Sequence, residues 1–400
     1  MSDSSAATDP GFAVRTTLLL TSTLTVMAGA TIAPSLPALS EHFADFPNVE
    51  YLARFVLTLP AFFVATCSPL AGYVIDRFGR RRLLIASVAL YGLAGASGAI
   101  FDSLPAILLS RALLGIAVAG TLTATTTLVG DYFSGLQRTK MMAWRTTAVN
   151  GGGVLFMSLG GVLASLNWRW PFLVYLLALA LLPIIIRYLK EPARAPKPRP
   201  TYNEDGSVVS VPVPWLLIGM LYLLTFLYSW IFYVIPVQLP FYLREIGLGD
   251  PGLAGMAMAV VLLSSAIVST VYAWIQANIS LPLRYLFGFG LMALGYASVG
   301  LFDNLAIVFF GMVVTGTGMG IVMPALAVSL MDAAPVHVRG RVMGGNSTAT
   351  MAGHFTSPLF SQPIVAGFGL SAPFQVSAVL LAVIAVVATV VILRRTRAKA

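Results

Sequence analysis

The sequence has few of the residues on which enzymes and disulfide-bonded proteins depend. Among its 400 residues there are one cysteine and three histidines, and only 10% are charged, whereas a soluble domain carries roughly 25% charged residues. The single Cys67 excludes a disulfide framework within the chain, and the sequence contains no Cys/His metal motif. It also lacks a paired-carboxylate or Ser/His/Asp pattern. We therefore expect no enzyme activity, no metal site and no cofactor.

Apolar residues make up most of the chain instead. They account for 58% of it, and the mean hydropathy is +0.87. Runs of about 20 apolar residues, the length with which a helix crosses a bilayer, recur between charged, proline-rich or glycine-rich breaks. The sequence therefore predicts an all-α membrane protein, surrounded by the lipid bilayer, with twelve transmembrane helices. These runs begin near Leu18, Leu52, Leu83, Leu104, Met141, Phe172, Trp215, Leu253, Tyr285, Leu305, Val342 and Pro373.

Basic residues mark one side of the predicted membrane topology. The chain has 24 lysines and arginines, and its formal net charge is +9. If both termini lie on the same side, all basic residues fall in or near loops on that side except Arg54, Arg111, Arg169 and Arg244. Because basic loops stay in the cytoplasm, we expect a multi-pass protein of a bacterial-type cytoplasmic (inner) membrane with both termini cytoplasmic. No clustered basic and aromatic surface indicates nucleic-acid binding.

A proline-rich and basic stretch divides the chain. Residues 191–213 have too little apolar content for a span and too many prolines for a regular helix. We therefore expect them to form a cytoplasmic linker between two six-helix bundles, one at residues 1–190 and one at residues 214–400.

The two predicted bundles repeat each other in register. Asp102 and Asp303 lie 201 residues apart, and Asp131 and Asp332 have the same separation. Matching charges in two separate loops are difficult to obtain by chance. Because an even number of spans separates the copies, they have the same orientation, as in parallel six-plus-six transporters.

A polar stretch between the second and third spans contains glycines, an aspartate and four arginines. Its arginines and aspartate would each cost at least ~2.5–3.5 kcal/mol at mid-membrane, so we expect a short aqueous loop that turns at its glycines. The stretch reads Gly72-Tyr-Val-Ile-Asp76-Arg77-Phe-Gly79-Arg80-Arg81-Arg82. It resembles the loop signature of the major facilitator superfamily of secondary transporters. Leu109-Ser-Arg111-Ala-Leu-Leu-Gly115 resembles a second motif of that superfamily.

The resemblance implies the superfamily's fold, in which a central cavity opens to each side of the membrane in turn. It also implies that Asp76 faces the start of the eleventh helix and that one arginine of the loop meets Asp131. An ion pair and a carboxylate at a helix N-terminus together contribute ~1–3 kcal/mol, which is enough to bias two conformations. We expect a latch that closes the cytoplasmic side in the outward-open state, formed by Gly72, Asp76, Arg77, Gly79, Arg80, Arg81 and Asp131.

Four ionisable residues are candidates for coupling transport to an ion. Arg111 lies roughly 10 Å into its span, and a charge at that depth indicates either a functional site or a structural pair. Glu50 and Arg54 are four residues apart, so they either pair with each other or take part in coupling. His354 lies in mid-span and suits a proton carrier. It could equally be a hydrogen-bonded packing residue.

Aromatic and hydroxyl side chains predict the wall of a substrate cavity for an amphipathic solute. By resemblance, the first, fourth, seventh and tenth helices line this cavity. The alternative is that the aromatic residues lie at the membrane interface and the threonines bond to their own helices. The candidates are Thr31, Thr123, Asn150, Tyr222, Phe226, Trp230 and Tyr233.

Two functions remain open from the sequence. The first is proton-driven, secondary active efflux of small amphipathic organic compounds, such as drugs or metabolites, by an antiporter. The second is import or facilitated passage of an anionic organic solute whose charge meets Arg111. Both readings have a small-molecule substrate, and we expect the transporter to be a monomer. The fifth span supports export only in part, because Phe156-Met157 stands where exporters of the family carry Gly-Pro.

Overall fold

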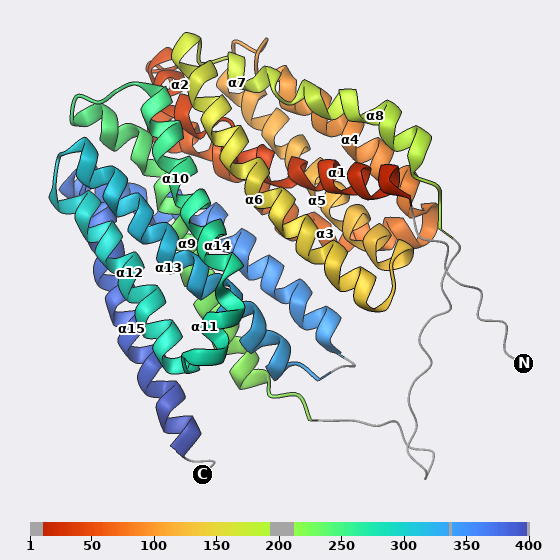
Figure 1. The fold of residues 1–400 in the computed structure, drawn as a ribbon. Coiled ribbons are helices and arrows are strands. Elements are labelled where there is room, and N and C mark those ends of the chain that lie inside the picture. The colour runs from red at the N-terminus through yellow and green to blue at the C-terminus, as the bar shows by residue number, and fades with distance from the viewer. Residues whose placement is uncertain (1–10, 193–211, 336–337, 398–400) are drawn as a thin grey trace, which may run out of the picture.

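The computed structural model describes residues 11–192, 212–335 and 338–397. These residues are almost entirely helical (Figure 1). Most of the predicted linker at 191–213 lies outside the described residues.

The first half of the chain forms helices α1 to α8. One span is broken at Thr31 to Ser35, where Pro34 and Pro37 interrupt the helical hydrogen bonding. The helices are α1 (Phe12–Ala30), η1 (Ala33–Ser35), α2 (Leu36–His42), α3 (Val49–Phe78), α4 (Arg80–Ser97), α5 (Leu104–Tyr132), α6 (Gly135–Leu166), α7 (Trp170–Leu173) and α8 (Leu176–Tyr188).

The second half forms helices α9 to α15. They are α9 (Trp215–Glu245), α10 (Pro251–Thr270), α11 (Tyr272–Asn278), α12 (Leu281–Leu301), α13 (Leu305–Ala333), α14 (Arg339–Phe368) and α15 (Ala372–Arg397). As in the first half, a short helix continues a longer one, because α11 follows α10 after a single residue.

Nine segments of the described residues are long and apolar enough to cross a membrane. The long helices outside this group are α4, α12 and α14, whose arginine, glycine and hydroxyl residues lower their average hydropathy. They pack lengthwise against α5, α13 and α9 respectively. Together these segments give twelve helical crossings, and the predicted all-α membrane fold of two six-helix bundles is confirmed.

The helices extend beyond the limits expected from the apolar runs. The fifth span was expected to begin near Met141, but α6 begins at Gly135, so Arg138 lies within a helix and not in a loop. Similarly, α3 continues through Asp76 to Phe78. A helix can continue beyond the end of its apolar run, because water solvates the charged side chains at the helix ends.

The two halves meet along two helix pairs, α6 with α10 and α3 with α14. At the first pair the backbones approach closely, because a Cβ atom at Gly161 would lie 2.9 Å from the Pro251 carbonyl oxygen and 3.0 Å from the Gly255 Cα. Small residues allow such close packing in membranes.

We name the two ends of the molecule by their residues. The arginine face is the end that carries Gly79 and residues 80–82, and the distal face is the end that carries residues 43–48, 246–250 and 369–371. Figure 1 shows the two bundles converging toward the distal face and diverging toward the arginine face.

Candidate functional site

The expected loop on the arginine face is a single residue. Only Gly79 leaves the helical conformation, with φ +96°, and α4 begins at Arg80. Gly72, which was expected in a turn, lies inside α3. The Glu191 carboxylate accepts hydrogen bonds from the backbone N–H groups of Arg80 (2.7 Å) and Arg81 (2.8 Å), so it caps the start of α4.

An ion pair fixes this hairpin to the end of α5. Arg80 Nε donates to Asp131 Oδ2 at 2.9 Å, and the two side chains are only 12% and 15% exposed. This is one of the contacts that the resemblance implied. Arg81 donates to the carbonyl oxygens of Leu189 and Ile186 at 2.7 and 2.8 Å. All these contacts join helices of the first half.

Two further residues of the predicted latch lie in the last turn of α3. Asp76 and Arg77 are both exposed on the arginine face. The Arg77 guanidinium lies 5.5 Å from the ring centroid of its neighbour Phe78.

Arg111 is buried within the first half. The residue is 0% exposed, and its Nη2 donates to the carbonyl oxygens of Ala94 (3.0 Å) and Gly95 (2.7 Å) on α4. The guanidinium also lies 5.0 Å from the Phe172 ring and 5.1 Å from the Tyr175 ring. Arg111 therefore points toward α4, α7 and α8. The expectation that a substrate anion meets Arg111 does not fit this position, because the side chain is enclosed on the side away from the second half.

A polar network joins the two halves in the distal part of the molecule. Arg54 is 3% exposed, and its Nε and Nη2 both donate to Gln238 Oε1, at 3.1 and 2.9 Å. Gln238 Nε2 in turn donates to Ser361 Oγ at 2.8 Å. Gln362 Nε2 donates to Glu50 Oε2 at 3.1 Å. We call Glu50, Arg54, Gln238, Ser361 and Gln362 the distal clasp.

The simple ion pair expected between Glu50 and Arg54 is not what forms. Arg54 Nη1 donates to the Glu50 backbone carbonyl oxygen at 2.7 Å, while the Glu50 carboxylate accepts from the other half. Sequence reasoning missed Gln238 and Gln362, although an amide in an apolar span is itself a signal that a polar partner lies nearby. A second link, an ion pair between Arg244 and Glu41, joins the halves at the distal face.

The centre of the interface contains an aromatic stack. The Tyr233 and His354 rings have centroids 4.1 Å apart and planes inclined by 19°. A Cβ atom at Gly29 would lie 2.7 Å from the Tyr233 hydroxyl oxygen, so this side chain of α9 reaches α1 across the interface. Both Tyr233 and His354 are partly exposed, which places them at the boundary between the halves.

Several candidate wall residues serve helix packing instead. Trp230 is 8% exposed and lies edge-on to Phe360, with ring centroids 5.7 Å apart. The Tyr222 hydroxyl donates to the Val342 carbonyl oxygen at 2.7 Å and so ties α9 to α14. Phe226 is partly exposed, and its carbonyl oxygen would lie 2.7 Å from a Cβ at Gly353.

Of the candidate wall residues in the first half, two serve helix packing and one is partly exposed. Thr31 is fully buried, and its carbonyl oxygen would lie 2.2 Å from a Cβ at Gly160 of α6. The Thr123 hydroxyl bonds back to the Ala119 carbonyl oxygen at 2.7 Å, as the packing alternative expected. Asn150 is partly exposed on α6.

One further arginine joins two helices of the first half. Arg145 of α6 is partly exposed, and its Nε donates to Ser22 Oγ of α1 at 3.1 Å. Sequence reasoning placed Arg145 in a cytoplasmic loop and missed it.

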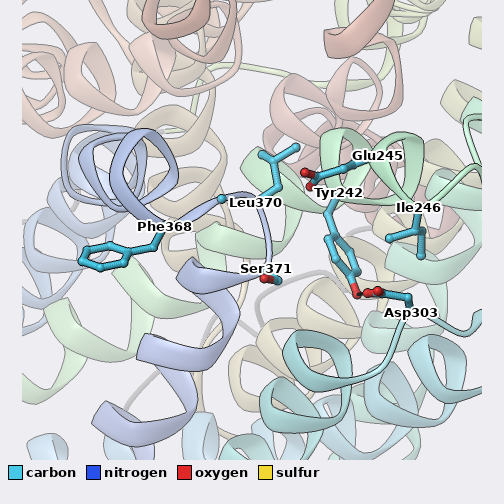
Figure 2. A pocket seen from close by; sticks show the side chains of 8 residues that line it. Tyr242, Glu245, Ile246, Asp303, Phe368, Leu370 and Ser371 are labelled. Carbon is cyan, nitrogen blue, oxygen red and sulfur yellow. Dashed lines mark hydrogen bonds between the residues drawn. The ribbon is translucent and has the colours of Figure 1, made fainter.

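A separate pocket of about 560 Å³ opens on the distal face of the second half. Figure 2 shows the Tyr242 hydroxyl directed at Asp303, to which it donates at 2.8 Å. The pocket lies outside the interface between the halves, because its lining residues all belong to the second half. They include Tyr242, Glu245, Ile246, Asp303, Phe368, Leu370 and Ser371.

Characterised transporters match parts of this sequence. The bacillibactin exporter of Bacillus subtilis (strain 168) is 30% identical over 154 residues, which cover 36% of this chain and 37% of the exporter. The 3-(3-hydroxy-phenyl)propionate transporter of Escherichia coli (strain K12) is 28% identical over 197 residues, 47% of either chain. The chain therefore spans less than half the length of these relatives in the regions that match.

Comparison by structure covers nearly the whole chain. A bacterial homolog of the human lysosomal transporter Spinster superposes with a TM-score of 0.75 over 96% of both chains, at 15% identity. The family model of the Major Facilitator Superfamily matches residues 18–358 and, in a second match, residues 221–400. The chain therefore belongs to the major facilitator superfamily and is a multi-pass membrane protein.

Proposed function

We propose that this transporter exports small amphipathic organic compounds by alternating access and draws its energy from the proton gradient. The observation that carries the proposal is the distal clasp, which joins α3 to α9 and α14 where the bundles converge. A hydrogen bond to a charged group contributes ~1.5–3 kcal/mol. A few such bonds can set the balance between two conformations, and water can replace them when the halves separate.

The orientation follows from the basic residues. With the arginine face in the cytoplasm, the distal clasp closes the external side and the bundles diverge toward the cytoplasm (Figure 1). The working units are residues 1–190 and 214–400, which the linker at 191–213 connects. Both units belong to one chain, so a monomer suffices for the cycle.

The ion pair and the helix cap on the arginine face hold the residues that would close the cytoplasmic side. Arg80 with Asp131 and Glu191 with the start of α4 hold the α3–α4 hairpin in one shape. From the last turn of α3, Asp76 would reach the N-terminus of α14 when the bundles close on this side. The positive end of the α14 dipole would then favour its carboxylate.

Protons act on the distal clasp through Glu50. Its carboxylate accepts the amide hydrogen of Gln362, and a protonated carboxyl group is a weaker acceptor. Protonation from outside would therefore loosen the clasp and favour the outward-open conformation. His354 is the second coupling candidate, because it lies against Tyr233 at the centre of the interface.

The direction of transport is supported by relatives named as exporters, among them the bacillibactin exporter. Import of an anion remains the alternative, because another relative is named as a transporter of 3-(3-hydroxy-phenyl)propionate. In that case the substrate charge would have to meet a residue other than the enclosed Arg111.

Transport in inverted membrane vesicles tests the proposal. When the vesicle interior is acidified, a panel of amphipathic compounds should accumulate inside against their gradients, and an uncoupler should abolish the accumulation. Vesicles without the protein are the control. Equilibration that ignores the pH gradient would show a facilitator and contradict proton-driven export.

A further inference from the structure

In the part of the chain that the structure describes, Arg145 is a positive charge between α6 and α1 that has no carboxylate partner. It lies ten residues after Gly135, the first residue of α6, which is roughly 15 Å along the helix. Within the described residues, its hydrogen-bond partner is Ser22 Oγ at 3.1 Å, and no ion pair includes it. An arginine within a membrane-spanning helix commonly marks a substrate or ion pathway.

The contact with Ser22 places Arg145 on the side of α1 that faces the second half. Ser22 lies seven residues before Gly29, and residues seven apart share one face of a helix. Gly29 faces α9, because a Cβ there would lie 2.7 Å from the Tyr233 hydroxyl oxygen. Arg145 is therefore at the interface, about 10 Å along α1 from the Tyr233–His354 stack on the side of the arginine face.

The second half makes the equivalent contact without a charge. The residue 201 positions after Arg145 is Asn346, which accepts a hydrogen bond from the Thr225 hydroxyl at 3.0 Å. That pair joins α14 to α9, as Arg145 and Ser22 join α6 to α1. A neutral amide is thus sufficient to join the helices at this position. The positive charge of Arg145 needs a different explanation.

We propose that Arg145 receives the acidic group of the transported compound, while the Tyr233–His354 stack receives its aromatic or apolar body. The planar guanidinium suits a carboxylate, because its nitrogens can donate two parallel hydrogen bonds. The substrate class is an amphipathic organic anion with about 10 Å between its charge and its apolar end. This inference rests on the proposed transport function and specifies its substrate.

Binding to the purified full-length protein tests the inference separately from transport. The probes are 5-phenylpentanoate and its uncharged isostere 5-phenylpentanamide, and the readout is the dissociation constant in lipid nanodiscs. Arg145→Gln should weaken binding of the anion by ~10-fold or more, because one charge-assisted contact is lost. Arg145→Lys should retain part of the affinity. Binding of the amide should be weak and equal in all variants.

Arg138→Gln is the matched control, because it removes the same charge from an exposed position of the same helix. It should bind the anion as the unsubstituted protein does. Equal anion binding by Arg145→Gln, equal binding of anion and amide by the unsubstituted protein, or no binding of the anion would each overturn the inference. Retained affinity in Arg145→Lys separates loss of the charge from misfolding.

The outcomes also separate this inference from the proposed function. If an uncharged amphiphile is pumped but anion binding does not depend on Arg145, the inference fails and proton-driven export stands. If anion binding depends on Arg145 but no compound moves against its gradient, the export proposal fails and the binding site stands.

Discussion

Arg54 of α3 and Gln238 of α9 are joined across the two halves by a pair of hydrogen bonds to one amide oxygen, at 3.1 and 2.9 Å. The Arg54 guanidinium also lies over the Phe241 ring of α9, 3.9 Å from the ring centroid. The side chain is almost completely buried. When the distal side opens, this guanidinium must exchange a protein acceptor for water.

Replacing the acceptor should therefore open the distal side. In Gln238→Leu the buried guanidinium loses its acceptor in the second half, at a cost of ~1.5–3 kcal/mol in the closed state. Spin labels are attached at Asp45→Cys in the first half and Glu245→Cys in the second, in a Cys67→Ser background. Molecules with a long distance between the two labels should be more abundant in Gln238→Leu than in the unsubstituted protein. Gln375→Leu is the control, because Gln375 donates to the Gly300 carbonyl oxygen within one half. Unchanged distances in Gln238→Leu would remove the distal clasp as a gate.

The Glu50 carboxylate should make distal opening sensitive to pH. In the unsubstituted protein, the long-distance population should rise as the pH falls, because protonation weakens the hydrogen bond from Gln362. Glu50→Gln should show a raised population with a flatter pH profile. Asp102→Asn, which affects an ion pair with Arg169 within the first half, should keep the original profile. A pH profile that is unaltered by Glu50→Gln would contradict this role.

Asp76→Asn tests the latch on the arginine face. An uncharged amide interacts less favourably with the N-terminal end of α14 than a carboxylate does, so the state closed on this side should lose stability. We expect slower transport with normal membrane insertion, measured as initial rates at matched protein levels. Normal rates with normal expression would count against the latch.

His354 can be tested without losing its ring stack. His354→Phe keeps an aromatic ring against Tyr233 but removes the group that could bind a proton. If His354 carries protons, this variant should bind substrate with near-normal affinity and lose pH-driven accumulation. His354→Ala serves as the comparison, since it loses both properties. Full pH-driven accumulation in His354→Phe would assign His354 to packing.

Arg111 should matter for stability and not for binding. Its guanidinium bonds to α4 carbonyl oxygens and contacts the Phe172 and Tyr175 rings. Arg111→Ala leaves a cavity and unsatisfied carbonyl groups, so we expect a loss of ~2–5 kcal/mol in the free energy of unfolding. The anion dissociation constant should remain within about twofold of normal. A stable variant that fails to bind the anion would contradict this assignment.

Local chemistry was sufficient to predict the membrane spans and the turn at Gly79. Apolar length determines whether a helix can cross a bilayer, so the spans could be located from the residues alone. Gly79 separates α3 from α4, because its positive φ is a conformation that glycine adopts easily. The family resemblance implied that one arginine of the loop meets Asp131, and in the structure this arginine is Arg80.

The bonding partners across the bundle could not be obtained in this way. Membrane helices are apolar on most sides, so hydrophobic periodicity does not reveal which side faces another helix, a cavity or lipid. Trp230 was expected at the cavity, and Arg111 was expected to be either a functional site or a structural pair. Both side chains contact residues of their own halves. Arg145 was expected in a loop and lies at the interface.

The sequence by itself determined the number of spans, their division into two similar halves and the position of the Gly79 turn. The spans and the turn depend on residues that are neighbours in the chain, and the two halves are recognised by comparing one part of the sequence with the other. Only the tertiary structure decided that Arg54 meets Gln238 and that Arg145 meets Ser22. Those pairs lie 184 and 123 residues apart, and packing of whole helices, not local conformational preference, brings them together.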